Sequence, residues 1–507
     1  MSLKVLSALD SAKTQFYHFK AIIVAGMGLF TDAYDFFCIS IIMKLIARIY
    51  YENESEKYQI KTSVLAVMVS TMFLGTAIGQ VVFGRLGDRR GRRSVYGLAL
   101  MLMVISSIGC GFSICRTRNC VLVSLGFFRF FLGLGIGGDY PLSATIMSEF
   151  ANKRTRGSFI AGVFSLQGFG ILASAMVSMF VLKMFWISAD DLTKDHTPED
   201  ADIAWRLILM LGAIPAGLTY YWRMMMPETA RYTALVENNV LQAAKDMEKV
   251  LDVSMSQIAE EEILLQDRQT YPLFSKKFLR RHGRDLFSCS INWFLLDIVF
   301  YSSNLFQSQI YSQFLKLEND NVYQESFKIA AFQAIVAISA TIPGYYFTVF
   351  FIDRIGRRKI QITGFFSMGL VYFALGISYS HWRDNTNAGF LVLYGLTFFF
   401  ANFGPNTTTF IVPAELFPAR FRSTCHGIAG AVGKLGALVG SLGVLWATDE
   451  KDMVDDVLVP KNKAMTVTLV VLGVVCVLGM VLSYLYTPET MGRSLEDNEI
   501  DEDEDDR

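Results

Sequence analysis

Gly87-Asp88-Arg89-Arg90-Gly91-Arg92-Arg93 follows one apolar block of the chain, and Ile352-Asp353-Arg354-Ile355-Gly356-Arg357-Arg358 follows another about 265 residues later. Two further pairs of segments recur at nearly the same distance: Glu149 to Arg154 with Glu415 to Arg420, and Pro227-Glu228-Thr229 with Pro488-Glu489-Thr490. Three repeats at one distance are typical of an internal duplication. We therefore predict that the chain consists of two related halves.

The composition is that of a membrane protein, because 52% of the 507 residues are hydrophobic and only 18% are charged. The apolar residues form blocks of about twenty, each long enough to cross a hydrocarbon core about 30 Å thick. The predicted spans are Ala21 to Leu45, Ser63 to Phe83, Val95 to Ile114, Val121 to Ser143, Gly157 to Phe185, Leu207 to Met224, Leu286 to Tyr311, Ala330 to Ile352, Ile360 to Ser380, Gly389 to Val412, Gly427 to Trp446 and Val467 to Tyr486. We predict an all-α polytopic membrane protein with twelve transmembrane helices, in two six-helix halves around a central cavity.

The positions of the basic residues predict the orientation of the spans. Arg-rich loops close to span ends remain on the cytoplasmic side of a membrane, so both seven-residue repeats should be cytoplasmic, and an even number of spans puts both termini there as well. The predicted segments are an N-terminal half at 1–226, a central cytoplasmic loop at 227–284, a C-terminal half at 285–488 and an acidic cytoplasmic tail at 489–507. The net charge of −1 does not indicate a nucleic-acid partner, and the expected surroundings are the lipid bilayer.

Carboxylates inside the apolar blocks indicate function, because a charge at bilayer depth is costly unless it is paired, protonated or wetted. Asp32 and Asp35 lie three residues apart in the first span, and Asp35 is nearer to its middle. We favour a functional role for Asp35 and regard Asp32 as a secondary candidate that could instead be a wetted helix-end residue. In the seventh span, Trp293, Asp297 and Tyr301 follow one stripe of the helix. Asp35 and Asp297 are expected to face one another across the cavity as partners related by the duplication.

Further polar side chains interrupt other spans. Asp139 follows several glycines of the fourth span, and these glycines do not form a dinucleotide-binding loop because they lie inside an apolar helix. Gln167 and Asn406 offer amide groups that would bind either a neighbouring helix or a substrate. Lys434, in the eleventh span, can either neutralise a carboxylate or extend to the cytoplasmic edge.

The cysteines and the charged loops do not indicate an enzyme. Cys115 and Cys120 flank a short loop, where they would form either a disulfide bond or two unlinked thiols. The spacing of metal ligands is absent from the sequence, and the cytoplasmic segments contain no grouping of nucleophile, base and orienting residue. We therefore expect neither a metal nor a cofactor.

Two segments resemble the plant and fungal high-affinity inorganic phosphate:proton symporters of the major facilitator superfamily: Gly138-Asp139-Tyr140-Pro141-Leu142-Ser143-Ala144-Thr145 and Gly404-Pro405-Asn406-Thr407-Thr408-Thr409-Phe410. The first is similar to the signature of that family, and the resemblance covers essentially the whole chain. It implies import of inorganic phosphate together with protons across the plasma membrane. Whether arsenate is a second cargo is left open by the sequence.

The resemblance also implies roles for individual residues. Phosphate would be held by Tyr140, Gln167, Trp293, Asp297, Tyr301 and Asn406. Protons would be carried by Asp35, Asp139 and Asp297. The two halves would be clamped on the cytoplasmic side by Asp88, Arg92, Glu149, Arg154, Asp353, Arg357, Glu415 and Arg420.

The predicted mechanism is alternating access. A site built from phenols, an indole, amides and a carboxylate is short of cations, so an arriving anion would meet like charge unless Asp297 were protonated. Two other functions are compatible with the same residues. The protein could be a phosphate-sensing receptor that signals through its tail or central loop, or a carrier of another small anion or of a sugar.

Overall fold

The computed structural model describes residues 16–52, 58, 60–113, 117–188, 197–251, 271–314, 321–384, 388–447, 451–454, 457–460 and 462–499. The N-terminal half contains α2 (Phe16–Phe37), α3 (Ile39–Tyr50), α4 (Thr62–Arg90), α5 (Arg92–Gly111), α6 (Arg118–Phe150), α7 (Arg156–Ser188) and α8 (Ala201–Met225). Two short helices follow it, α9 (Ala230–Leu235) and α10 (Val240–Leu251). The rest of the central loop at 252–270 and the acidic stretch after Glu499 lie outside the described residues.

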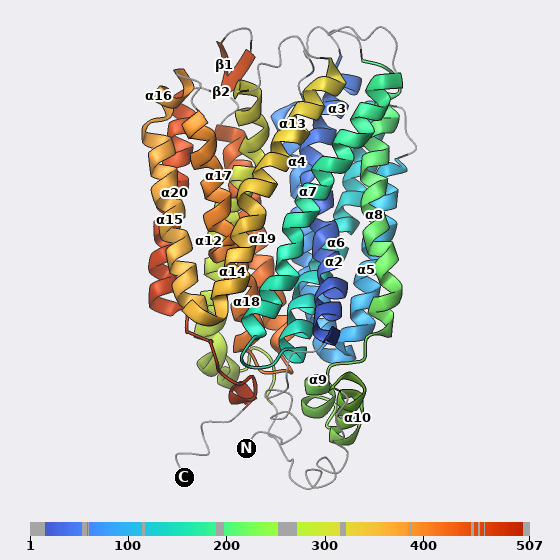
Figure 1. Ribbon diagram of the computed structural model, residues 1–507, viewed down its shortest axis with the longest axis vertical. Coiled ribbons are helices and arrows are strands. Elements are labelled where there is room, and N and C mark those ends of the chain that lie inside the picture. Colours follow the sequence, from blue (N-terminus) through green and yellow to red (C-terminus); the bar gives the residue numbers. More distant parts are fainter. Residues whose placement is uncertain are drawn as a thin grey trace.

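The C-terminal half repeats this arrangement. It contains α12 (Lys276–Phe314), α13 (Val322–Val336), the π-helical turn η2 (Ala337–Thr341), α14 (Ile342–Ile355), α15 (Arg357–Ile377), α16 (Tyr379–Asp384), α17 (Ala388–Asn402), α18 (Pro405–Leu416), α19 (Arg422–Ala447) and α20 (Asn462–Tyr486). An antiparallel hairpin of β1 (Lys451–Val454) and β2 (Val457–Pro460) precedes α20, and the 3₁₀ turn η3 (Glu496–Glu499) follows it. The hairpin lies at one end of the bundle, the hairpin end, and α9 lies at the other, the α9 end (Figure 1).

The tenth predicted span is the one that does not form a single membrane-crossing segment among the described residues. In the described residues, eleven helical segments are long and apolar enough to cross a membrane, and the block Gly389 to Val412 instead forms α17 and α18. The break falls at Phe403-Gly404 because Pro405 has no N–H group and disfavours a helical residue before it. The backbone of Gly404 also packs directly against Gly364 of α15, where a side chain would not fit. The twelve predicted spans are therefore eleven segments of membrane-spanning length and one that is divided into two shorter helices, as occurs where a transporter helix lines a substrate site.

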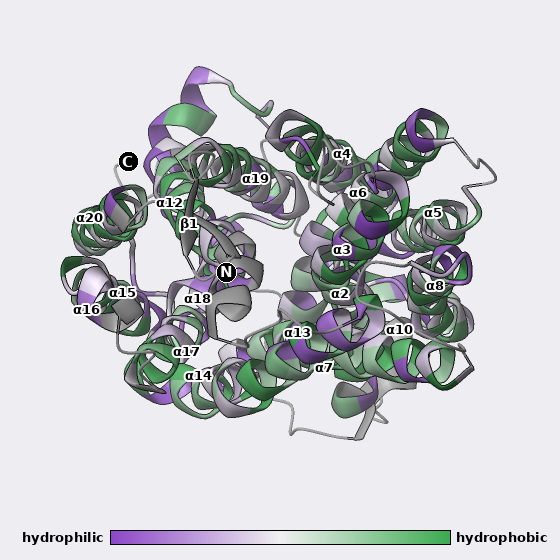
Figure 2. Ribbon diagram, turned by 90° about the horizontal axis from the view of Figure 1, so that it is seen from above, coloured by the Kyte–Doolittle hydropathy of each residue, from purple (hydrophilic) through white to green (hydrophobic). Residues whose placement is uncertain are grey.

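The two halves lie side by side, and most of their packing is concentrated in two regions. Seen from above, α19 lies next to α4, and α13 and α14 lie next to α7 (Figure 2). Large apolar side chains such as Val67, Phe180, Leu218 and Ile377 are exposed on the outer helices. So much exposed apolar surface is expected where a bundle faces lipid.

The predicted cysteine pair lies partly outside the described residues, because Cys115 is not among them. Cys120 is disulfide-bonded. The cysteines inside the apolar blocks (Cys38, Cys110, Cys289, Cys425 and Cys476) are free and buried.

Glycines allow α4 and α19 to pack closely between the halves. A β-carbon at Gly427 of α19 would lie 2.1 Å from the Gln80 carbonyl oxygen of α4, and one at Gly84 would lie 2.6 Å from the Ser423 carbonyl oxygen. We predict that Gly427→Ala forces the two helices apart and lowers the stability of the purified protein by about 1–3 kcal/mol, measured by thermal unfolding in detergent.

The matched control is Gly443→Ala on the same helix, where an added β-carbon meets no atom within 4 Å. This change should leave stability unaltered or raise it slightly, because alanine favours the helix. Equal effects of the two substitutions would contradict the packing argument.

Candidate functional site

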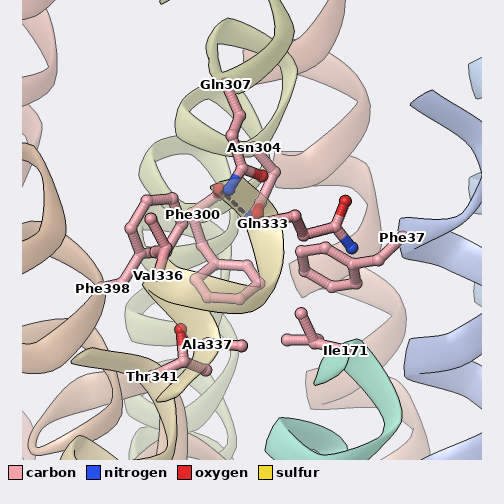
Figure 3. Close-up of a pocket in the computed structure, with 10 residues that line it drawn as sticks. All are labelled: Phe37, Ile171, Phe300, Asn304, Gln307, Gln333, Val336, Ala337, Thr341 and Phe398. Atoms are coloured by element: carbon pink, nitrogen blue, oxygen red, sulfur yellow. Dashed lines mark hydrogen bonds between the residues drawn. The ribbon is translucent and has the colours of Figure 1, made fainter. Parts of the chain in front are cut away.

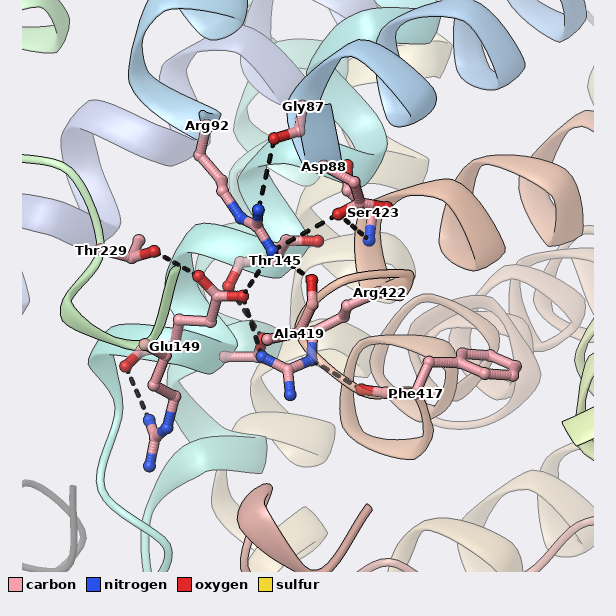
Figure 4. Close-up of polar contacts among 12 residues, drawn as sticks. Gly87, Asp88, Arg92, Thr145, Glu149, Thr229, Phe417, Ala419, Arg422 and Ser423 are labelled. Carbon is pink, nitrogen blue, oxygen red and sulfur yellow. Dashed lines mark hydrogen bonds and ion pairs between the residues drawn. The ribbon is translucent and has the colours of Figure 1, made fainter. Parts of the chain in front are cut away.

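At the α9 end, Glu149 of α6 is the centre of a buried ion cluster that joins the two halves (Figure 4). Its Oε1 lies 3.0 Å from Arg92 Nη2 of its own half and 2.9 Å from Arg422 Nη1 of α19. Arg92 Nη2 also donates to the Ala419 carbonyl at 2.6 Å, in the C-terminal half. These three side chains are at most 1% exposed, so each charge depends on its partners for compensation.

The C-terminal half forms the corresponding cluster around Glu415. Arg357 contacts both carboxylate oxygens of Glu415, at 3.0 and 2.8 Å, and its Nη1 lies 2.7 Å from Asp353. The duplication seen in the sequence is therefore also present in the side-chain contacts.

Each half also caps a helix of the other half. Asp88 accepts hydrogen bonds from the backbone N–H groups of Ser423 (3.2 Å) and Thr424 (2.7 Å) at the start of α19. Asp353 accepts one from the backbone N–H of Ser158 (2.8 Å) at the start of α7. A carboxylate at a helix N-terminus satisfies free N–H groups and interacts favourably with the helix dipole. Separating the halves at this end would break both caps.

Two of the arginines predicted for this clamp do not lie in it. Arg154 is exposed, and the Arg420 guanidinium stacks over the Tyr271 ring at 4.0 Å. The arginines two positions later in each repeat are buried instead. Arg422 pairs with Glu149, and Arg156 donates to the Arg493 carbonyl at 3.0 Å. Both positions hold arginine in both repeats, so the sequence pattern could not choose between them.

The Pro-Glu-Thr repeats complete the same two clusters. Thr229 donates to Glu149, and Thr490 donates to Glu415. Glu228 accepts the backbone N–H of Arg93 at 3.1 Å, and Glu489 accepts that of Arg357 at 3.0 Å. Burial raises the pKa of Glu228 despite these hydrogen bonds.

The first part of the acidic tail contacts the central loop and the C-terminal half at the α9 end. Glu496 of η3 lies 2.8 Å from Arg231 of α9, and the Asn498 amide donates to the Glu415 carbonyl at 2.9 Å. Burial opposes the ionisation of Glu496, but Arg231 lowers its pKa to about 2. Because this pKa is depressed, the contribution of the pair to stability is present above the ordinary pKa of a glutamate. It is lost as the pH falls toward 2.

Midway along the bundle, four neutral side chains form a hydrogen-bonded chain across the halves. The Gln167 amide of α7 donates to the Tyr140 hydroxyl of α6 at 2.6 Å. The Tyr345 hydroxyl of α14 donates to Gln167 Oε1 at 3.1 Å, and Asn406 Nδ2 of α18 lies 3.0 Å from the Tyr345 hydroxyl. Asn406 is held in turn by Asn402 Oδ1 at 2.7 Å. The break between α17 and α18 thus brings an amide to the centre of the bundle.

Lys434 lies beside this chain and supplies a positive charge. Its Nζ is 3.1 Å from Asp297 Oδ2 and donates to the Tyr301 hydroxyl at 2.7 Å. The ammonium is also 5.3 Å from the centroid of the Tyr140 ring. Lys434 is 4% exposed and does not extend to the edge of the bundle, so the expectation of a site short of cations was wrong. Trp293 is buried next to them, with its ring centroid 6.5 Å from that of Tyr140. We call Tyr140, Gln167, Trp293, Asp297, Tyr301, Tyr345, Asn406 and Lys434 the central cluster.

The two carboxylates of the first span have different neighbours. Asp32 interacts with the Tyr140 hydroxyl and with the charge of Lys434, so it borders the central cluster. Asp35 lies inside the N-terminal half, where Oδ1 accepts from Ser107 at 3.3 Å and Oδ2 has no hydrogen-bond partner among the described residues. The expectation that Asp35 faces Asp297 is therefore not met. Three positions on a helix differ by about 60° in direction, which suffices to separate the two surroundings.

Asp139 is also directed into the N-terminal half, although its neighbour Tyr140 belongs to the central cluster. Its Oδ1 lies 2.5 Å from Arg223 Nη1 of α8, and its Oδ2 accepts from Ser143 at 3.2 Å. Arg223 in addition stacks over the Tyr96 ring at 4.0 Å. The pair is fully buried.

Sequence reasoning missed several residues of this region. Arg129 is 1% exposed and is a charged neighbour of Asp35, and its Nε and Nη1 have no hydrogen-bond partner among the described residues. An arginine in the middle of the fourth apolar block is a strong signal that could have been used. Arg223 lies at a span end, and Tyr345 looks like any aromatic residue of a span. These two could not be recognised from the pattern alone.

A small cavity lies between the halves, lined in part by Asn304, about one turn beyond Tyr301 on α12 (Figure 3). Its lining residues are Phe37, Ile171, Phe300, Asn304, Gln307, Gln333, Val336, Ala337, Thr341 and Phe398. It has room for about one water molecule. The halves are thus in contact at the α9 end, and this cavity between them is small.

Comparison with known proteins gives consistent results. A family model described as "Sugar (and other) transporter" matches residues 21–502. A protein from Arabidopsis thaliana named "Probable inorganic phosphate transporter 1-8" is 61% identical over 515 residues, covering 99% of this chain and 95% of its own. A Petunia hybrida protein named "Low affinity inorganic phosphate transporter 3" is 54% identical over 510 residues, covering 98% of this chain and 94% of its own.

Among solved structures, a major facilitator superfamily proton:xylose symporter bound to 6-bromo-6-deoxy-D-glucose matches with a TM-score of 0.71 and 21% identity. The match covers 95% of this chain and 98% of the symporter. The human organic anion transporter MFSD10 matches with a TM-score of 0.62, 16% identity and coverage of 92% and 100%. The two structures establish the fold.

The ion cluster at the α9 end gives a direct test of the arginine assignment. Arg422→Gln leaves the buried Glu149 with fewer cations and should lower stability by about 3–5 kcal/mol in thermal unfolding of the purified protein. Arg154→Gln, at the exposed position of the matching repeat, should change stability by no more than about 0.5 kcal/mol. A comparable loss in both variants would contradict the assignment.

Proposed function

Because the chain belongs to the sugar (and other) transporter family, we propose that it imports inorganic phosphate together with protons by alternating access. The observation that carries this proposal is Lys434, buried between Asp297 and Tyr301 and next to a chain of neutral hydrogen-bonding groups. The names of the relatives, "inorganic phosphate transporter", support phosphate as the substrate. The Petunia hybrida name includes "low affinity", so the names do not show whether this chain would bind phosphate with high affinity.

The central cluster has the chemistry that a phosphate ion needs. A dihydrogen phosphate ion carries one negative charge and presents both donors and acceptors. Lys434 would compensate the charge, while Tyr140, Gln167, Trp293, Tyr301 and Asn406 would hydrogen-bond the oxygens. Tyr345 was not expected, and it would position Gln167 and Asn406, which it bridges.

The pairing of Lys434 with Asp297 suggests how substrate and proton are coupled. A bound phosphate takes the ammonium of Lys434 as its own counter-ion, so Asp297 loses its compensation in a medium where an unpaired charge is costly. Protonation of Asp297 removes that cost. Phosphate and a proton then bind together, and loss of the proton on the other side restores the Lys434–Asp297 pair and releases the anion.

We place the proton route in the N-terminal half at Asp35 and Asp139. Asp35 has an oxygen without a hydrogen-bond partner among the described residues, and Arg129 is its charged neighbour. Asp139 forms a direct ion pair with Arg223, so it can take up a proton only when that pair separates. Asp32, at the border of the central cluster, lies between this route and Lys434.

The α9 end is the proposed cytoplasmic side, because the Arg-rich repeats lie there. We also propose that both termini are cytoplasmic and that the membrane is the plasma membrane. In this proposal 1–226 and 285–488 are the halves that move, and 227–284 is the loop that joins them. An inside-negative potential favours the cycle if more positive than negative charge enters, by about 2.3 kcal/mol per net charge per 100 mV.

Asp297→Asn tests the coupling. Asparagine neither compensates Lys434 nor takes up a proton, so phosphate uptake should fall by roughly 100-fold or more. The measurement is labelled phosphate uptake by transport-deficient cells across external pH, with surface localisation checked. Wild-type uptake should rise at acid pH and collapse with an uncoupler.

The matched control for this experiment is Asp497→Asn, because that carboxylate is exposed and remote from the central cluster. It should transport like wild type. Undiminished uptake by Asp297→Asn would contradict the proposed role of this residue.

A sugar substrate is the competing function, since the xylose symporter shares the fold. Lys434 favours the anion, because a neutral sugar gains little from a buried ammonium. Excess arsenate should therefore inhibit labelled phosphate uptake, and the same excess of xylose should not. Inhibition by xylose alone would favour the sugar.

A further inference from the structure

At the hairpin end, an ion cluster joins the two halves on the side opposite to the Arg-rich repeats. Lys44 Nζ of α3 lies 2.7 Å from Glu325 Oε1, and Arg48 Nη2 of the same helix lies 3.0 Å from Glu325 Oε2. Lys44 and Arg48 are one turn apart in the N-terminal half, whereas Glu325 belongs to the first turn of α13 in the C-terminal half. One carboxylate is thus held by two cations.

The position of Glu325 is well defined by its own helix. Asn321 and Gln324 form a capping box at the start of α13, in which the Asn321 side chain accepts the Gln324 N–H at 2.9 Å and the Gln324 side chain accepts the Asn321 N–H at 3.2 Å. Glu325 follows immediately and is 9% exposed. The cap fixes the helix start, so the carboxylate is directed at α3 whenever the halves meet at this end.

The same helix leads from this cluster to the central cluster. Gln333, about two turns further along α13, lines the small cavity together with Asn304 and Gln307 of α12 (Figure 3). Tyr301, which accepts from Lys434, lies about one turn before Asn304 on α12. From the hairpin end inward, the order is therefore two cations, a cavity with three amide side chains, and the Lys434 site.

Opening of the hairpin end changes the surroundings of the two cations. The halves of such transporters move largely as rigid bodies. Lys44 and Arg48 remain together on α3, whereas Glu325 leaves with α13. Two cations one turn apart that have lost their shared carboxylate can bind another oxyanion, and the arginine fork suits the tetrahedral face of a phosphate.

We propose that Lys44 and Arg48 form a capture site for the phosphate oxyanion at the hairpin end, and that Glu325 occupies this site in the closed state. Because the α9 end is the proposed cytoplasmic side, we call the hairpin end the outer mouth. This inference rests on the proposed function. The carboxylate and the phosphate compete for the same cations, so an arriving anion both gathers at the mouth and weakens the contact that keeps it closed.

The exposure of the two cations is consistent with capture rather than with closure alone. Closure needs only one cation for one carboxylate. The second leaves the cluster of Lys44, Arg48 and Glu325 with one excess positive charge in the closed state, and the Lys44 side chain is 35% exposed there. Such a charge attracts anions from solution and raises their rate of encounter.

The test first removes the carboxylate that closes the mouth and then removes the two cations that would capture phosphate. In the Glu325→Gln background the ion pairs that Glu325 forms between the halves are already lost, so any further effect of Lys44→Gln and Arg48→Gln must arise on α3 itself. We expect the triple variant to have a KM for labelled phosphate roughly tenfold above that of Glu325→Gln alone, with a maximal rate within about twofold. The difference should shrink when the ionic strength of the medium is raised.

Two controls accompany the measurement. Lys183→Gln in the same background removes an exposed cation near the hairpin end of α7 and should not change the KM. Lys44→Arg with Arg48→Lys keeps both charges and should retain the low KM of Glu325→Gln, which also shows that the helix tolerates substitution.

The outcomes separate this inference from the function on which it rests. If wild type takes up phosphate and the triple variant has the same KM as Glu325→Gln, the cations only close the mouth and the capture site is overturned. If surface-localised wild type takes up no phosphate, the proposed function fails and the capture site fails with it. A raised KM that is insensitive to ionic strength would also overturn capture by charge.

Discussion

A charge at bilayer depth must be compensated, and this constraint orders the interior of the protein. Lys434 pairs with Asp297 at the centre, Arg223 pairs with Asp139 in the N-terminal half, and Arg129 lies near Asp35. Breaking such a pair by removing one partner costs several kcal/mol because it leaves an uncompensated buried charge. Exchanging one partner for another of the same charge leaves no such charge behind. The buried pairs are therefore suited to exchange, which is what a carrier of ions requires.

The duplication supplies two equal clamps, but the interior is not symmetric. Both halves place an aspartate at the start of a helix in the other half and surround a glutamate with arginine and threonine. The cation of the central cluster, by contrast, comes from the C-terminal half alone, and the two carboxylate–arginine neighbours lie in the N-terminal half. This asymmetry is consistent with the proposal that the C-terminal half compensates the anion while the N-terminal half carries protons. Asp32 is the contact between the two regions.

Sequence reasoning anticipated the twelve spans and the duplicated clamps, because hydrophobic length and repeat spacing are properties of the chain itself. It did not predict which neighbouring helices each polar side chain would face. Asp35 was expected across from Asp297, and Lys434 could equally have extended to the edge of the bundle, because spacing along one helix does not show which helices surround it. Arg420 was assigned to the clamp instead of Arg422 for the same reason, since the start of α19 decides which of the two arginines points inward. Arg129 was a different kind of omission, because a buried arginine is visible in the sequence.

The central claim is that phosphate takes Lys434 from Asp297 and thereby causes Asp297 to bind a proton. The most direct measurement is calorimetric titration of the purified protein with phosphate, in buffers of different ionisation enthalpy, at a mildly acid pH where phosphate is already the dihydrogen ion. The account predicts that wild type takes up protons as phosphate binds, and that Asp35→Asn takes up the same number because the proton linked to binding resides on Asp297. Binding without proton uptake in wild type, or uptake that disappears in Asp35→Asn while phosphate still binds, would contradict the account.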